Sequence, residues 1–450
     1  MARSESISGR NAAAGPKPAI GLWDAAAITV GIVLGAGIYR SPALVAAESG
    51  SGGEMLGAWA LGGLISLVGA LCYAELSAAF PSAGGEYHYL RRAFGRRFAF
   101  VYGWSRLAII QTGSIALLAY VYGDYASALL PLGRWSAAIH AAFAVLAITT
   151  VNWAGVTFGC RAQRWLTILE LAGLALVIVA GLFVAPEAAP VPHDGSGTLG
   201  LALVFVLLTY GGWNEAAYLS AELRNNRRLM MPMLVGCLVL LTILYVLANL
   251  AYLRALGLGG MAESNVVAAE VMRRAWGSGG ATLISIAVAV AALTSANATA
   301  FTGARSAYAL GADFPAFRFL GQWRSRGETP GNAFLFQGGA ALLLVGVGAF
   351  ARDGFQLAVE FTAPAFWLFF FGVGLSLFVL RRKEPNAERP FRVPLFPVLP
   401  AIFCLTSLYL LYSSLAYTGA GAWVGGTVLL FGALIAVVAG PEPAAVERSA

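Results

Sequence analysis

Two glycine-rich stretches interrupt long apolar runs, and both could expose backbone groups to a polar ligand. The first, "GIVLGAGIY", covers residues 31–39, and the second, "LLTYGGWNEAAY", covers residues 207–218. Glycine inside a helix costs about 1 kcal/mol relative to alanine, so its repetition at Gly31, Gly35 and Gly37 predicts unwinding. Unwound backbone offers N–H and C=O groups, and the N-terminus of the following helix attracts an anion such as a carboxylate.

Helix packing is the alternative interpretation of the first motif. Gly31 and Gly35 have the spacing of small residues with which membrane helices approach one another closely. A second glycine pair, Gly211 and Gly212, stands five apolar runs later. Because paired interruptions at corresponding positions of two halves indicate a transporter's substrate site, the pair favours ligand binding.

Three charged residues inside apolar runs are further functional candidates: Arg106, Glu170 and Glu215. Runs 98–129 and 163–185 have the same direction and place Arg106 and Glu170 at similar depth, so we expect a buried salt bridge between them. The alternative is that Glu170 carries a proton for coupling. Glu215 either faces the ligand site or accepts a hydrogen bond from a freed backbone N–H.

The composition is that of an integral membrane protein. Of the 450 residues, 59% are hydrophobic and only 11% are charged, whereas soluble domains carry about 25% charged residues. The apolar residues form runs of about 20, the length that spans a bilayer as a helix. We therefore predict twelve transmembrane helices, at residues 22–45, 56–80, 98–129, 137–153, 163–185, 199–221, 231–253, 281–309, 332–350, 356–380, 393–415 and 421–440.

The basic residues set the orientation. Most Lys and Arg residues fall in segments on the same side as the N-terminus, which predicts that both termini are cytoplasmic. The net charge of +7 is explained by this asymmetry, so no nucleic acid is needed. Residues 1–19 lack the apolar segment of a cleaved signal peptide, and we expect a multi-pass protein of the inner or plasma membrane.

Nothing in the sequence resembles a Ser/His/Asp set, a metal-ligand cluster or a phosphate-binding loop. An enzyme is therefore excluded, and no cofactor or metal is expected. Since five spans separate the two glycine motifs, the second unit enters the membrane from the opposite side, as an inverted repeat does. We predict an N-terminal tail, two five-span repeats, a final span pair and a C-terminal tail, at residues 1–19, 20–185, 198–381, 392–440 and 441–450.

Several stretches together resemble the amino acid–polyamine–organocation (APC) superfamily, in particular its L-type amino acid transporter (LAT) branch and bacterial relatives. They are "GIVLGAGIY" (31–39), "GALCYAELSAAFPSAGGEYHYLRRAFG" (69–95), "YGGWNEAAYLSAELRN" (210–225), "GARSAYALGAD" (303–313) and "RPFRVPLFPVLP" (389–400). The resemblance implies an all-α, leucine-transporter-like fold with a 5+5 inverted repeat and broken helices 1 and 6.

The resemblance also implies site residues. Backbone N–H groups of Gly35, Ala36 and Gly37 would hold a substrate carboxylate. Carbonyls around Ile32, Tyr210 and Gly211 would take the ammonium group, and Trp213 and Asn214 would line the site. This chain departs from the family at three of its positions: Ala36 replaces a small hydroxyl residue, Leu208 an aromatic gate, and Glu170 a lysine.

The expected function is secondary active transport of neutral α-amino acids by alternating access. The bilayer and the amino acid are the expected partners, with a proton or an exchanged amino acid as coupling species. Two alternatives remain: a carrier of cationic amino acids or polyamines, with Glu215 or Glu170 as counter-charge, and a nutrient receptor of the same fold that does not transport.

Overall fold

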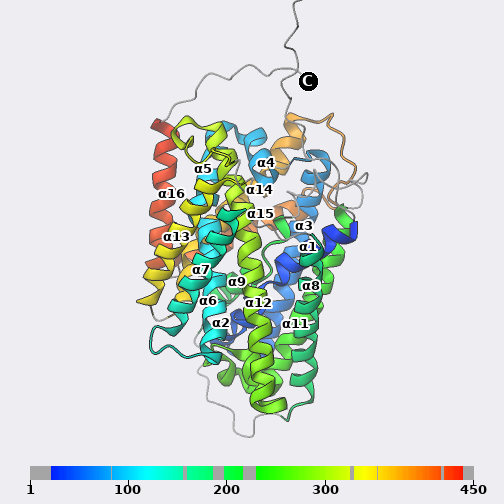
Figure 1. Cartoon of the computed structure of the whole chain (residues 1–450). Coiled ribbons are helices and arrows are strands. Elements are labelled where there is room, and N and C mark those ends of the chain that lie inside the picture. Colours follow the sequence, from blue (N-terminus) through cyan, green and yellow to red (C-terminus); the bar gives the residue numbers. More distant parts are fainter. Residues whose placement is uncertain are drawn as a thin grey trace, which may run out of the picture.

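The computed structural model describes residues 22–82, 84–155, 160–185, 197–215, 230–324, 329–351, 353–416 and 420–438. Within these residues the chain is a bundle of helices without a β-strand, and most helices run roughly along one axis (Figure 1). The predicted tails, 1–19 and 441–450, lie outside the described residues.

The helices follow the predicted apolar runs in order. The first half holds α1 (Leu22–Leu34), η1 (Ala36–Tyr39), α2 (Ser41–Ala47), α3 (Gly52–Ala79), α4 (Gly85–Phe94), α5 (Arg96–Ser105), η2 (Arg106–Ile110), α6 (Gln111–Leu129), α7 (Ser136–Ala154) and α8 (Cys160–Phe183). The second half holds α9 (Leu199–Thr209), η3 (Trp213–Glu215), α11 (Met230–Ala262), α12 (Val267–Asp313), η5 (Pro315–Phe317), α13 (Gly331–Ala349), α14 (Gly354–Lys383), α15 (Val398–Ala416) and α16 (Ala420–Val438).

The chain is an all-α membrane protein. In its described part, 9 helices are long and apolar enough to cross a bilayer, or 10 if the bent pair Thr29–Tyr39 and Ser41–Ala47 is one span. Helices α9 and α16 are apolar but shorter. Residues 216–221 of the sixth predicted span lie outside the described residues, so the total of twelve and the inverted repeat stay predictions.

Both glycine motifs stop an α-helix. Helix α1 ends at Leu34, the chain passes through the 3₁₀ turn η1, and α2 then starts with a bend of 53°. Helix α9 ends at Thr209 and gives way to a turn and the short η3. Gly212 has a φ of +103°, a left-handed conformation that favours glycine.

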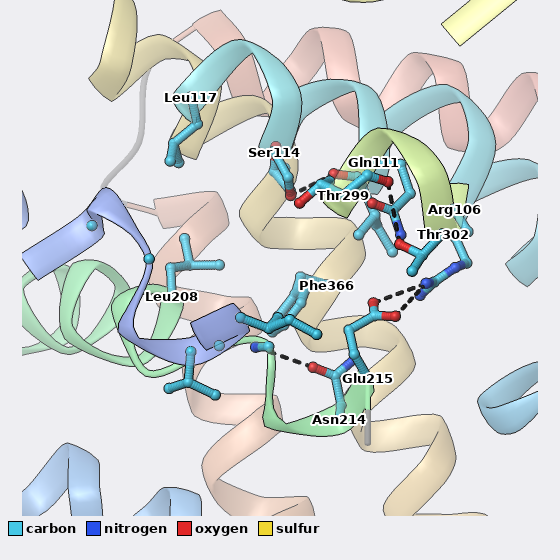
Figure 2. Close-up of a pocket in the computed structure, with 18 of the residues that line it drawn as sticks. Arg106, Gln111, Ser114, Leu117, Leu208, Asn214, Glu215, Thr299, Thr302 and Phe366 are labelled. Carbon is cyan, nitrogen blue, oxygen red and sulfur yellow. Dashed lines mark hydrogen bonds and ion pairs between the residues drawn. The ribbon is translucent and has the colours of Figure 1, made fainter. Parts of the chain in front are cut away.

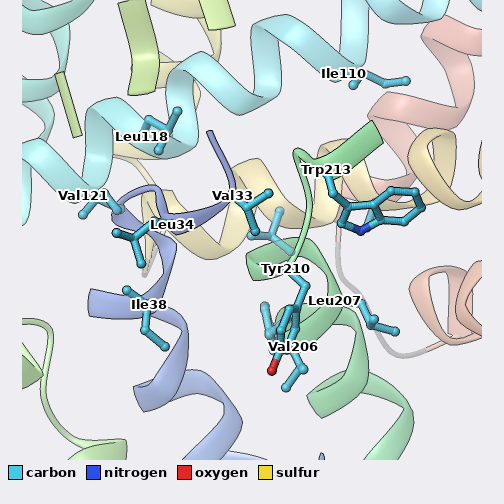
Figure 3. Close-up of a cluster of buried hydrophobic side chains, with 14 of the residues drawn as sticks. Val33, Leu34, Ile38, Ile110, Leu118, Val121, Val206, Leu207, Tyr210 and Trp213 are labelled. Carbon is cyan, nitrogen blue, oxygen red and sulfur yellow. The ribbon is translucent and has the colours of Figure 1, made fainter. Parts of the chain in front are cut away.

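Tyrosines from neighbouring helices hold the backbone near the first interruption. The Tyr245 hydroxyl of α11 donates to the Val33 carbonyl at 2.7 Å, and the Tyr125 hydroxyl of α6 donates to the Tyr39 carbonyl at 3.0 Å. A backbone carbonyl inside a membrane needs a partner where helical bonding stops, and these hydroxyls supply it. Apolar side chains of both segments, among them Ile38 and Val206, belong to one buried hydrophobic cluster (Figure 3).

Two long helices also bend. Helix α11 turns at Gly257, with a φ of +69°, and α12 turns at Trp276 and Gly277. The part of α12 before this turn, from Val267, is therefore a short separate helical segment. At the opposite end of the bundle lies the short helix α4 (Figure 1).

Candidate ligand site between two interrupted helices

A cavity of about 150 Å³ lies where the two interrupted segments meet (Figure 2). Helices α4, α5, α6, α12 and α14 and the turn η2 complete its walls. The residues that line it from the two glycine motifs are Ile32, Val33, Gly35, Gly37, Leu208, Thr209, Gly211, Gly212, Asn214 and Glu215.

The glycines allow the two segments to touch. A Cβ atom on Gly212 would lie 2.8 Å from Cγ2 of Ile32, and one on Gly37 would lie 3.2 Å from Cγ2 of Thr209. The first distance is shorter than a Cβ atom tolerates, and the second is tight. Glycine at both positions therefore lets the end of α9 pack directly against the interruption after α1.

Polar side chains gather on the wall that faces the interruptions (Figure 2). Gln111 and Ser114 come from α6, and Thr299 and Thr302 come from α12. Apolar residues, among them Leu117 and Phe366, complete this side of the cavity. The wall therefore combines a few hydrogen-bonding groups with apolar surface, as small-molecule sites do.

A salt bridge closes one end of the cavity. Nη2 of Arg106 lies 2.8 Å from Oε1 and 2.9 Å from Oε2 of Glu215 (Figure 2). The Arg106 side chain is 3% exposed and that of Glu215 is 15% exposed. Nε of Arg106 also donates to the Ser306 hydroxyl of α12 at 3.1 Å. One arginine thus ties the second interrupted segment to η2 and α12.

Glu86 of α4 belongs to the same charged cluster. It accepts hydrogen bonds from the hydroxyls of Tyr73 and Tyr102 and, at 3.2 Å, from the Asn214 amide. Nη1 of Arg106 lies 3.5 Å from its carboxylate. Sequence reasoning missed Glu86, because nothing in a charged, amphipathic stretch marks one carboxylate as buried. Its burial follows only from the packing of α4 against α5 and α14.

Arg106 does not pair with Glu170, contrary to the prediction. Both carboxylate oxygens of Glu170 are buried and lack a hydrogen-bond partner among the described residues. Helix α8, which carries Glu170, packs against α1, α11 and α12, whereas η2 packs mainly against α5, α6 and α14. A similar position along two predicted spans was therefore not enough to make the Arg106 and Glu170 side chains face each other.

Three of the other predicted site residues lie beside the cavity and are absent from its lining, although the structure describes them: Ala36, Tyr210 and Trp213. The Trp213 ring, expected to line the site, packs with Tyr73 at 5.0 Å and Phe370 at 5.5 Å between ring centroids. Two large aromatic surfaces bury the indole better than a small polar cavity does.

The helix that carries Arg106 contains a π-helical turn. In η2, the N–H group of Gln111 donates to the carbonyl of Arg106, five residues earlier. Such wide turns occur inside α-helices frequently at functional sites. Here the turn lies between the charged end of the cavity and its polar wall.

A second buried arginine lies beyond the first interruption. Arg40 donates to Oδ1 of Asn265 at 2.8 Å and to Oδ2 of Asp124 at 3.3 Å, and it also pairs with Asp353, the N-cap residue of α14. The cluster joins the start of α2 to α6, α14 and the segment before α12. It lies toward the end of the bundle opposite α4.

A third ion pair lies outside the spans. Arg92 of α4 donates to both carboxylate oxygens of Glu384, at 2.5 Å and 2.6 Å. The hydrogen bond from Arg92 lowers the pKa of Glu384 below its usual value. With side chains 43% and 27% exposed, this pair contrasts with the buried clusters.

An all-helical bundle whose described part holds 9 helices long and apolar enough to cross a bilayer defines an integral membrane protein. The sequence profile of the amino acid permease family matches residues 20–439. The chain therefore belongs to this family, within the APC superfamily, and is a transporter rather than an enzyme.

Individual relatives are similar over most of their length. The chain is 32% identical to the b(0,+)-type amino acid transporter 1 of Mus musculus over 410 residues, which cover 87% of this chain and 81% of that protein. It is 28% identical to the serine/threonine exchanger SteT of Bacillus subtilis over 409 residues, 89% and 92% of the two chains. It is 30% identical to the human cystine/glutamate transporter over 412 residues, 88% and 80% of the two chains.

Proposed function

We propose that this protein transports neutral α-amino acids across the cell membrane by alternating access, with the cavity as the substrate site. The observation that carries the proposal is the joint lining of one small cavity by Gly37 and Gly211, one from each interrupted segment. Backbone groups at these ends can hold the carboxylate and ammonium groups that all α-amino acids share.

The local dipoles support this assignment. The N-terminal end of η1 lies at Gly35 to Gly37, and both glycines line the cavity; the start of a helix favours an anion. Ile32 and Leu208, near the C-terminal ends of α1 and α9, line the same cavity, and the carbonyl end of a helix favours a cation. The substrate carboxylate would lie at the N-terminal end of η1, and the substrate ammonium group would lie near Ile32 and Leu208.

The charged groups of the cavity favour a neutral substrate side chain. Arg106 already pairs with Glu215 inside the cavity, and Glu86 accepts two tyrosine hydroxyl groups and an amide. A charged side chain would have to break these bonds in a buried site, which is costly. A cationic amino acid or polyamine is therefore the second candidate.

Glu170 supports proton coupling over exchange alone. A buried carboxylate without a partner is most stable in its neutral, protonated form, because an unpaired charge is expensive to bury. Glu170 lies on α8, which packs against α1. Loss and gain of its proton could therefore bias the first interrupted segment.

Counterflow in proteoliposomes tests the proposal. A panel of radiolabelled neutral, cationic and acidic amino acids is offered to preloaded vesicles, and accumulation of a neutral amino acid is expected. Gly37→Val should abolish it, because a β-branched side chain collides with Thr209. Gly339→Val is the matched control, since no atom lies within 4 Å of its Cβ position.

Other outcomes select the alternatives. Equal competition by decarboxylated analogues would replace the proposal with a polyamine carrier. Binding of amino acids without accumulation in preloaded vesicles would indicate a receptor. Accumulation by Gly37→Val at the wild-type rate would remove the cavity from the transport path.

A further inference from the structure

The cavity differs from a simple apolar pocket in its polar wall. Gln111 is 3% exposed, lines the cavity, and receives no hydrogen bond on its side-chain amide from any residue that the structure describes. Its carboxamide group is therefore available to a ligand in the cavity, as both donor and acceptor. Such a group needs an explanation, and a ligand that completes its hydrogen bonds supplies one.

Two hydroxyl groups that line the cavity with Gln111 are already used as hydrogen-bond donors. Ser114 donates its proton to the Ile110 carbonyl at 2.7 Å, and Thr302 donates its proton to the Thr299 carbonyl at 3.2 Å. A hydroxyl that donates to its own helix keeps its lone pairs as acceptors. Both residues line the cavity and therefore offer acceptors to a donor on the ligand.

The wall thus offers acceptors on α6 and α12 and an amide that can both donate and accept. Figure 2 shows the four polar residues, Gln111, Ser114, Thr299 and Thr302, gathered on one side of the cavity. The two glycine motifs lie on the other side. A substrate held at its carboxylate and ammonium groups by these motifs would direct its side chain toward the polar wall.

The size of the cavity limits that side chain. Its volume is about 150 Å³, similar to that of an engineered protein cavity that holds one benzene molecule. A small amino acid of about seven to nine heavy atoms is of this scale, whereas one with a large aromatic or guanidinium side chain is not. The bulky neighbours Phe366 and Leu117 also line the cavity.

We infer that the transporter selects small α-amino acids with a side-chain hydroxyl or carboxamide, and that Gln111 is the main residue that determines this specificity. The inference rests on the proposed function, whose substrate class it narrows. A site built to hydrogen-bond a hydroxyl rejects the analogue without it, because its own polar groups are then left unpaired.

Threonine and valine test the inference, since they differ by a hydroxyl in place of a methyl group at nearly equal volume. Inhibition of radiolabelled L-threonine counterflow is measured for both, and for asparagine against leucine. Threonine and asparagine are expected to inhibit at concentrations at least about tenfold lower than their apolar partners. Gln111→Leu should erase or reverse this preference.

Folding of the variant is checked separately. Replacing an unpartnered buried amide by an apolar side chain should leave the melting temperature unchanged or raise it. Gln111→Met is a second variant that preserves side-chain length, and it should lose the preference as well. Gln337→Leu is the matched control: Gln337 is 1% exposed, but it is absent from the lining of the described cavity, so the preference should remain.

The outcomes separate the inference from the proposed function. If valine inhibits as well as threonine in the wild type while neutral amino acids accumulate, the polar wall does not select and the inference is overturned. An unchanged threonine preference in folded Gln111→Leu and Gln111→Met also overturns it. If no neutral amino acid accumulates or inhibits, the proposed function itself is overturned.

Discussion

Two buried arginines, one in the wall of the cavity and one beyond the first interruption, have chemically similar surroundings. Arg40 and Arg106 are each 3% exposed, and each has two carboxylates near it together with neutral oxygen partners. They differ in position. Arg106 and its partner Glu215 line the cavity, whereas Arg40, in the same described part of the chain, does not.

This difference separates two roles for the same chemistry. The Arg106 cluster lies where a ligand can contact it, so occupancy of the cavity can alter its bonds directly. The Arg40 cluster joins α2, α6 and α14 beyond the interruption, so it can respond only when those helices move. Similar burial and charge therefore do not imply a similar response to substrate.

The largest effect is expected for Arg106→Ala. It leaves Glu215 and Glu86 buried near each other without their cation, which should reduce the free energy of unfolding by about 3–5 kcal/mol. Transport should be lost as well, because the substitution would remove the salt bridge that orders the charged end of the cavity. Equilibrium unfolding in detergent measures the first effect and counterflow the second.

The charge swap provides the control. Arg106→Glu combined with Glu215→Arg should recover part of the lost stability, and the four proteins form a double-mutant cycle. A coupling energy near zero between the two positions would contradict the salt bridge as the source of the effect.

Arg40→Ala should destabilise somewhat less, by about 3 kcal/mol, since its carboxylate partners are 15% and 22% exposed. Substrate binding distinguishes the two arginines further. Because Arg40 does not line the cavity, the folded fraction should bind substrate with a Kd within about twofold of the wild type. Equilibrium binding in detergent decides this, and a tenfold weaker Kd would place Arg40 in the binding site.

Glu170→Gln should leave the free energy of unfolding within about 1 kcal/mol of the wild type, because no salt bridge is broken among the described residues. Uptake driven by a pH gradient should fall, while exchange of internal for external amino acid continues. Both rates are measured in the same vesicles. Unchanged pH-dependent uptake would remove Glu170 as the proton carrier.

The smallest effect is expected at the exposed pair. Arg92→Ala should cost at most about 1 kcal/mol at neutral pH, and less in high salt. Because Arg92 lowers the pKa of Glu384 in the folded state, the stabilisation is full above the unfolded pKa of about 4.3. It disappears as the pH falls through the lower folded value. The free energy of unfolding of the wild type and of Arg92→Ala is measured between pH 7 and pH 3. A difference between the two proteins that grows on acidification would contradict the prediction.

The helices and the general place of the site could be predicted from sequence for a simple reason. Run length and hydropathy determine where a membrane helix lies, and repeated glycines show where its hydrogen bonding stops. The direction of a side chain around its helix axis carries no such signal in a single sequence. The segments that carry Arg106 and Glu170 pack against largely different sets of helices, and the wrong prediction of their pairing followed from an argument on depth alone.

The same limit explains why the positions of the Trp213 and Glu86 side chains could not be predicted from the sequence. An aromatic residue beside a glycine pair suits a cavity wall as well as an aromatic cluster, and only the positions of Tyr73 and Phe370 decide between them. Glu86 precedes a basic, amphipathic stretch that is typical of a surface helix. Its burial depends on contacts with Tyr102 and Asn214, which are distant in the chain.

The π-helical turn at Arg106–Ile110 makes the length of this span adjustable. A wide turn accommodates one extra residue while it keeps Gln111 bonded to Arg106. Deleting one residue from 107–110 would restore ordinary α-helical spacing and leave both ends aimed at the cavity. The same deletion further along α6 would rotate every later residue by about 100°. A homologue that lacks one residue in this span can therefore lose it at the turn without rearranging the polar wall.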